Sequence, residues 1–111
     1  MNKDDLVESY FANIRNQNLD GLIAFFAHDA TMTLPDGREF AGVAAIRAMY
    51  GALFTAQSPS PRPIAVIAGA QGLAAEIEAT LPNGTVRRTA NFFHLNSAGM
   101  IQRMSIYARA G

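Results

Sequence analysis

The chain contains no cysteine and no tryptophan. The absence of cysteine excludes disulfide bridges, thiolate metal sites and cysteine nucleophiles. An excess of charge of one sign is also missing, because nine Lys and Arg balance nine Asp and Glu. This balance gives no reason to expect binding to nucleic acid or to an anionic membrane surface. We therefore expect the function to depend on a pocket or on a protein surface.

Long apolar runs are absent as well. No stretch approaches the roughly 20 residues that a membrane-spanning helix requires, and the polar start "MNKDDLVESY" has the pattern of neither a signal peptide nor a membrane anchor. We expect a cytoplasmic protein without membrane contact. The 111 residues suit one compact domain, residues 1–111.

Apolar residues recur at helical spacing in the first half of the chain. This periodicity predicts helices over residues 4–16, over residues 19–27, with an end near His28 and Asp29, and over residues 43–54. Between the last two, "ATMTL", "PDG" and "REFAG" predict a hairpin of two short strands. The segment "TAQSPSPRP" holds three prolines and is expected to be a loop.

The second half of the chain has the pattern of strands. Four segments, at residues 63–70, 72–81, 85–95 and 100–108, are separated by turn sequences. Helices followed by an antiparallel sheet predict an α+β fold of order α-α-β-β-α-β-β-β-β, in which a curved sheet wraps a long first helix. A ligand would bind in the space between helix and sheet.

The turn "PNG" sets the register of two of these strands. A two-residue turn at Asn83 and Gly84 places Glu78 opposite Thr89 and Glu76 opposite Asn91. The face opposite to these polar residues is more apolar and comprises Ile77, Ala79, Leu81, Val86, Ala90 and Phe92. Alternation by itself favours burying that apolar face and leaving Glu76 in water.

The order of elements resembles the cone-shaped α+β domains related to nuclear transport factor 2. Within this group, "ESYFANIRNQNLDGLIAFFAHDATMTLPDG" and "FAGVAAIRAMY" resemble the bacterial ketosteroid isomerases and the SnoaL-like, or polyketide-cyclase-like, domains. The resemblance covers nearly the whole chain. It implies the fold more specifically than the activity, because the fold hosts isomerases, hydratases, cyclases and inactive binding proteins.

In the isomerases an Asp general base moves a proton between two carbons, and a Tyr and a protonated Asp hydrogen-bond the dienolate oxygen. The resemblance assigns the Tyr to Tyr10 and the protonated Asp to Asn91, whose amide is an uncharged donor. The base falls on Leu34, which cannot accept a proton. Glu76 and Glu78 are then the candidates for a replacement base, and the alternative is that they are solvated strand residues.

The resemblance also implies a mostly apolar cone. Its expected lining comprises Tyr10, Phe11, Ile14, Phe26, Met32, Leu34, Met49, Phe54, Phe93, Met104 and Ile106. In this arrangement the polar residues, with Arg87 and Asn91, face the cavity, and an outer patch with Ile77, Ala90 and Phe92 forms a homodimer interface. Two alternatives follow: Phe92 lies at a subunit interface with Glu76 in the pocket, or Phe92 lies in the core with Glu76 in solvent.

Three functions remain open at this stage. One is an isomerase-like enzyme for a small apolar or carbonyl-bearing molecule, with Tyr10 and Asn91 as oxyanion donors. Another is a binding protein without turnover, in which Arg87 meets a ligand carboxylate. The third is a partner-binding dimer, which a filled cavity would favour. No cofactor is expected, and His28 and His94 lie too far apart in sequence to suggest a metal site.

Overall fold

The computed structural model describes residues 2–56 and 60–109. The elements follow the expected order, and their bounds are α1 Lys3–Arg15, α2 Leu19–Ile23, β1 Phe26–Thr33, β2 Glu39–Ala41, α3 Val43–Ala56, β3 Ser60–Ala68, β4 Gly72–Thr80, β5 Val86–Leu95 and β6 Ile101–Ala108. The prediction of an α+β fold is confirmed. No helix in the described part of the chain combines the length and the apolar character that crossing a membrane requires.

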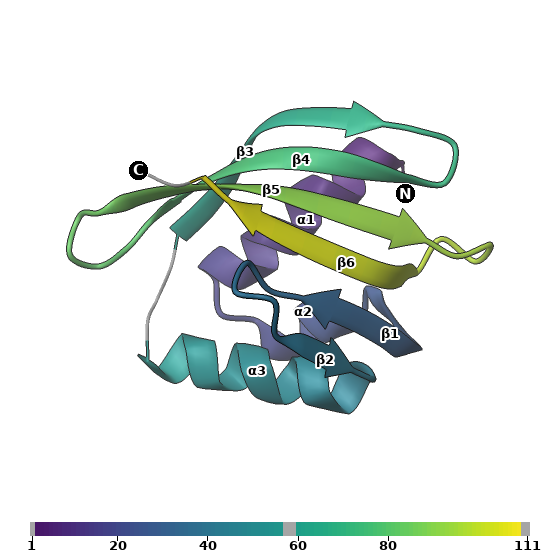
Figure 1. The fold of residues 1–111 in the computed structure, drawn as a ribbon, viewed down its shortest axis with the longest axis horizontal. Coiled ribbons are helices and arrows are strands. Elements are labelled where there is room, and N and C mark those ends of the chain that lie inside the picture. The colour runs from purple at the N-terminus through teal and green to yellow at the C-terminus, as the bar shows by residue number, and fades with distance from the viewer. Residues whose placement is uncertain (1, 57–59, 110–111) are drawn as a thin grey trace.

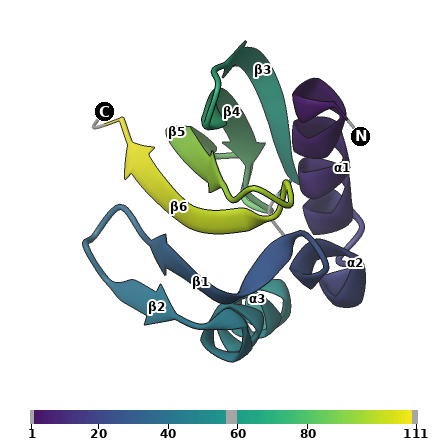
Figure 2. The same cartoon turned by 90° about the vertical axis from the view of Figure 1, so that its right-hand side faces the viewer.

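Helix α1 begins where the sequence predicts. The side chain of Asn2 caps the helix by accepting a hydrogen bond from the backbone N–H of Asp5 at 2.8 Å. Its apolar face is buried and comprises Leu6, Val7, Tyr10, Phe11 and Ile14. This face turns toward the sheet, so that α1 lies inside the curve of the strands (Figure 2).

The predicted second helix is too long. Helix α2 ends at Ile23, and β1 already begins at Phe26, so His28 and Asp29 belong to a strand. Phe26 pairs with Ile101 of β6, and the backbone N–H of Ile101 donates to the carbonyl of Phe25 at 2.9 Å. Pairing with a strand from the other end of the chain thus overrides the local helical spacing.

The prediction of a loop up to Pro63 is also wrong in part. Strand β3 starts at Ser60 and includes Pro61 and Pro63, whereas residues 57–59 lie outside the described residues. The two prolines are tolerated because β3 is the edge strand of the sheet and pairs only with β4.

The six strands form one curved sheet in the order β2-β1-β6-β5-β4-β3 (Figure 1). The sheet is mixed, because β1 pairs with β6 in parallel while the other neighbours are antiparallel. The purely antiparallel sheet expected from the sequence therefore needs correction. The long chain excursion between β1 and β6 permits this parallel pair.

The predicted register of β4 and β5 is wrong by one residue. The backbone N–H of Leu81 donates to the carbonyl of Thr85 at 2.8 Å, which leaves a three-residue loop, and Gly84 adopts φ +87°. Asn91 consequently pairs with Ala75, and Glu76 pairs with Ala90. Because side chains alternate along a strand, this shift moves every side chain of β4 to the face opposite to the expected one.

Candidate functional site

The inner face of the sheet carries one buried polar residue among the described residues, Asn91, which is 3% exposed. Its side-chain amide donates to the hydroxyl of Thr89 at 2.8 Å. In the sheet, Asn91 pairs with Ile106 of β6. Ser105, which precedes Ile106, pairs with Thr33 of β1. Leu34, the residue after Thr33, therefore lies level with Asn91. The two residues are two strands apart, so their backbones are separated by about 10 Å.

Tyr10 occupies the centre of the core and is fully buried. Its ring centroid lies 5.3 Å from that of Phe93, and its hydroxyl donates to Met104 Sδ at 3.3 Å. The same hydroxyl also forms a hydrogen bond with the hydroxyl of Tyr50 from α3. Burial and the neighbouring Tyr50 raise the pKa of Tyr10 well above its ordinary value. Both phenols are therefore neutral at physiological pH.

The two glutamates that were candidates for a base lie outside the cone. Glu76 is exposed on the outer face of the sheet, and Glu78 forms an ion pair with Arg88 at 3.1 Å. At 32% exposure, the side chain of Glu78 is the least exposed of the described carboxylates. The register shift thus removes both glutamates from the cavity in which a replacement base was expected. The predicted register puts Phe92 and Glu76 on opposite faces of the sheet, whereas both lie on the outer face.

The expected pocket lining is mostly core. Besides Tyr10, six of the expected lining residues have side chains that are at most 5% exposed. These are Phe11, Ile14, Phe26, Met32, Phe93 and Met104. Phe54 and Ile106 are partly buried against this core. Leu34 and Met49 line a cleft of about 400 Å³ between the β1–β2 hairpin and α3, together with Phe40.

A second cleft lies at the open end of the cone, where β5 extends past the last residue of β6. It measures about 420 Å³ and is lined by Pro35, Thr85, Val86, Arg87, Arg88, Thr89, Ala108 and Arg109. Arg87 and Thr89 have the same strand parity as Asn91, so the cleft leads toward the inner face of β5.

Neither histidine belongs to a group of potential metal ligands. Across residues 2–56 and 60–109, no three His, Asp or Glu side chains come together as a metal site requires. The ring of His94 forms a hydrogen bond with Arg103 at 3.1 Å on the outer face. Partial burial, and then the charge of Arg103, lower the pKa of His94.

Comparison with models of known protein families shows to which of the similar families the chain belongs. The family model of the SnoaL-like domain matches residues 7–104. The chain belongs to the SnoaL-like family. No functionally curated protein matches the sequence.

Several solved structures share the fold of this chain. The epoxide hydrolase/cyclase-like enzyme SalBIII, which takes part in pyran ring formation in the polyether salinomycin, is 22% identical, with a TM-score of 0.83 over 96% of this chain and 90% of its own. A candidate polyketide cyclase from Xanthomonas campestris pv. campestris is 24% identical, with a TM-score of 0.83 over the same shares. A candidate ketosteroid isomerase from Kribbella flavida is 16% identical, with a TM-score of 0.86 over 96% and 77%. At these identities the likeness establishes the fold and leaves the activity open.

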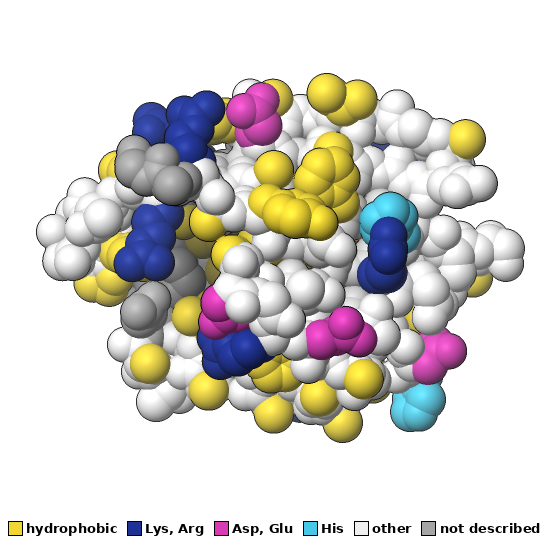
Figure 3. All heavy atoms as spheres, viewed as in Figure 1, with side chains coloured by type: hydrophobic (Ala, Val, Ile, Leu, Met, Phe, Trp, Pro, Cys, Tyr) yellow, Lys and Arg dark blue, Asp and Glu magenta, His cyan; other side chains and the backbone are white. Residues whose placement is uncertain are grey.

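The outer face of this SnoaL-like domain carries exposed aromatic side chains. Phe92 is 39% and Tyr107 is 61% exposed, and their ring centroids lie 5.7 Å apart at 86°. The space-filling view shows apolar side chains clustered near the centre of this face (Figure 3). Ile77, which was expected there, is only 2% exposed and belongs to the core.

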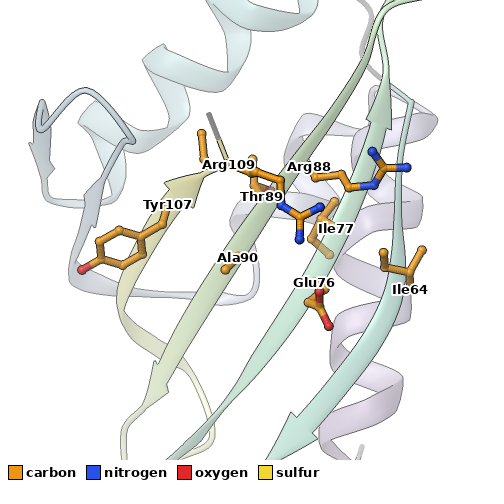
Figure 4. A pocket seen from close by; sticks show the side chains of 9 residues that line it. Ile64, Glu76, Ile77, Arg88, Thr89, Ala90, Tyr107 and Arg109 are labelled. Atoms are coloured by element: carbon orange, nitrogen blue, oxygen red, sulfur yellow. The ribbon is translucent and has the colours of Figure 1, made fainter. Parts of the chain in front are cut away.

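Beside this aromatic pair the outer face is hollowed by a cleft of about 240 Å³. Glu76, Arg88 and Arg109 gather around it, and Tyr107 borders it from β6 with its ring turned away from these three side chains (Figure 4). Sequence reasoning missed Tyr107 and Arg109 because both lie near the C-terminus, where no motif marks them. It also missed Tyr50 as the partner of Tyr10, although Ile46 and Tyr50 have the spacing of one buried helix face.

Proposed function

We propose that this SnoaL-like domain binds a small carbonyl-bearing molecule at the open end of the cone and does not transfer a proton. One observation carries the proposal. The inner face offers hydrogen-bond donors, including Asn91 and Thr89, whereas none of the described side chains on that face is a carboxylate or an imidazole. Donors orient and polarise a carbonyl oxygen, but proton transfer next to a carbonyl needs a base.

The position of Leu34 supports the same conclusion. It stands level with Asn91 and partly buried, so a ligand that reaches Asn91 meets an apolar wall where the isomerases have a base. Tyr10 does not offer a free donor, because its hydroxyl already contacts Tyr50 and Met104. These contacts support recognition rather than turnover.

The test is an ultraviolet assay for migration of a β,γ double bond into conjugation, with 3-cyclohexen-1-one and a 3-keto-5-ene steroid as substrates. Wild type should show no rate above buffer. Leu34→Asp should acquire a rate, because it restores a carboxylate level with Asn91, whereas the isosteric Leu34→Asn should remain silent. Turnover by wild type would refute the binding-only function.

Binding itself is measured separately. Titration with 2-cyclohexen-1-one should shift the side-chain amide resonances of Asn91 in a saturable manner, and Asn91→Leu should weaken binding about tenfold, as the loss of one buried hydrogen bond predicts. If the ketone leaves the resonances of Asn91 and Thr89 unchanged, the open end is not its site.

A second function, self-association, is favoured by the exposed pair Phe92 and Tyr107. An exposed aromatic pair on a sheet face is typical of a surface that another protein covers, and two copies related by a two-fold axis would each bury the same patch. Ala90 lines the same outer face beside them. Sedimentation velocity at micromolar concentration tests this function, and a monomer would exclude it.

A further inference from the structure

We infer that two copies of this chain pack outer face to outer face about Phe92, with Glu76 of each copy paired to Arg103 of the other. This inference rests on the second proposed function, self-association, and adds which side chains meet. It begins with the apolar surface that the fold leaves in contact with solvent. The exposed large hydrophobic side chains of the described residues are Ile64, Ile67, Val86, Phe92 and Tyr107.

These five residues gather on the outer face of the sheet. Ile67 is level with Phe92 two strands away, and Val86 has the same strand parity as Phe92. The ring of Tyr107 contacts that of Phe92, and Ile64 lines the outer-face cleft. Exposed apolar side chains that collect on one face are typical of a surface that another protein covers.

Phe92 stands among small side chains on this face. It pairs with Ala74 of β4 on one side and with Ser105 of β6 on the other, and Ala90 precedes it by two residues. A shallow cleft of about 540 Å³ adjoins the ring and includes Tyr107 in its lining. The space above the small residues can accept an aromatic ring from a second copy, and aromatic pairs of this kind are favourable when they are buried.

Glu76 and Arg103 lie at matching positions on opposite sides of Phe92. Glu76 pairs with Ala90, two residues before Phe92, and Arg103 pairs with His94, two residues after it. Strands are spaced by about 4.8 Å and rise by about 3.4 Å per residue, so each of the two lies about 8 Å from Phe92 in opposite directions. Within one chain they are therefore about 17 Å apart.

This placement makes the outer face complementary to itself. A two-fold axis that crosses Phe92 between two stacked sheets, at right angles to the line from Glu76 to Arg103, brings Glu76 of each copy over Arg103 of the other. The ion pairs within residues 2–56 and 60–109 use neither of the two, and the ring of His94 gives Arg103 only a hydrogen bond. Two reciprocal ion pairs then flank the aromatic contact and fix how the copies are oriented.

Arg109 distinguishes this arrangement from a general attraction between charged faces. Its guanidinium group lies on the outer face near Glu76 of the same chain (Figure 4), and the two form no ion pair. Arg109 follows β6 beside Arg88, so it lies on the same side of Phe92 as Glu76. The axis that joins Glu76 to Arg103 of the other copy therefore leaves Arg109 without a carboxylate opposite it.

The experiment is a charge exchange measured by sedimentation velocity of the full chain over micromolar concentrations. Glu76→Arg and Arg103→Glu should each raise the dissociation constant of the dimer at least about tenfold, because each breaks two ion pairs and opposes like charges. The double variant Glu76→Arg/Arg103→Glu should restore the wild-type constant. Since the two residues are separated by more than a Debye length within one chain, restoration requires contact between copies.

Arg109→Glu is the matched control, because it makes the same change of charge on the same face and should leave the constant nearly unchanged. Both Glu76 and Arg103 are exposed in the single chain, so their variants should keep the fold. Weakening by Arg109→Glu equal to that by Arg103→Glu would overturn the pairing in favour of overall charge.

The remaining outcomes separate this inference from self-association itself. If wild type is a monomer, both fail, and the outer face is left to a different partner. If wild type dimerises and Phe92→Glu dissociates it, but the double charge variant does not regain the wild-type constant, only the pairing of Glu76 with Arg103 fails. An assembly of more than two copies would overturn the two-fold arrangement.

Discussion

The hydroxyl of Tyr10 on α1 and the hydroxyl of Tyr50 on α3 are hydrogen-bonded to each other inside the core. Tyr10 is fully buried and Tyr50 is 4% exposed. The pair joins two helices that are separated in sequence by α2 and the β1–β2 hairpin, and the sulfur of Met104 on β6 accepts a hydrogen bond from Tyr10. The two hydroxyls thus link two helices and the sheet through polar contacts inside the core.

Removing one hydroxyl of this pair should destabilise the fold. Tyr10→Phe leaves the hydroxyl of Tyr50 buried without its partner, at a cost of about 1–3 kcal/mol. Tyr50→Phe should cost less, because Tyr10 keeps Met104 Sδ as a weak acceptor. Urea unfolding measures both, and the double variant should cost less than the sum of the single variants. Strict additivity would show that the two hydroxyls do not interact.

Alkaline pH should weaken the fold through the same pair. Burial raises the pKa of Tyr50 to about 12, whereas tyrosine in the unfolded chain titrates near about 10. Between these values the unfolded chain has lost a proton that the folded chain keeps, so the free energy of unfolding falls as pH rises, by at most about 1.4 kcal/mol per pH unit for each such tyrosine. Below about pH 9 this contribution is constant.

Urea unfolding at a series of pH values tests this dependence. Tyr50→Phe serves as the comparison, because it keeps every other titrating group. A slope above about pH 10 that is the same in wild type and Tyr50→Phe would contradict the assignment.

Gly72 should tolerate no side chain. A Cβ atom at this position would lie 2.0 Å from the carbonyl oxygen of Phe93, a backbone atom in the neighbouring strand. Gly72→Ala must therefore separate β4 from β5 locally and should cost about 1–3 kcal/mol or more. Thermal unfolding measures the loss, and a neutral result would show that the two strands separate more easily than the structure indicates.

Gly51 provides the matched control for that substitution. It lies within α3, and a Cβ atom there would meet only Leu19 Cδ2 at an ordinary 3.7 Å. Gly51→Ala should stabilise the protein by about 0.5–1 kcal/mol, because alanine loses less backbone freedom in a helix. A destabilised Gly51→Ala would mean that α3 packs more tightly than these contacts show.

Phe92→Glu should abolish self-association through the outer face. A carboxylate at a buried interface is costly, so the sedimentation coefficient should fall to that of a monomer. The fold should be retained, because Phe92 is 39% exposed in the single chain. Ala48→Glu, on the exposed side of α3, is the control and should leave the assembly unchanged. A dimer that survives Phe92→Glu must use another surface.

Much of the fold could be predicted because local patterns determine it. The apolar spacing of α1, the alternation in β5 and the turn sequences gave the right elements in the right order. They failed where pairing across the chain outweighs local preference, as at His28 in β1 and at Pro61 and Pro63 in β3. An edge strand accepts prolines that a central strand would not, and sequence patterns do not show which strand is at the edge.

By itself the sequence determined which chemical groups the cone has available: leucine instead of a base at position 34, and an amide at position 91. Tertiary structure decided which of the other groups reach it. One residue more in the loop before Thr85 turned Glu76 and Glu78 outward and Ile77 inward, because the side chains of a strand alternate with a period of two. Packing around Tyr10 filled the floor of the cone, and the pairing of β5 with β6 placed Arg109 beside Arg88 at the outer-face cleft. These outcomes depend on contacts between residues far apart in the chain, which only the folded structure establishes.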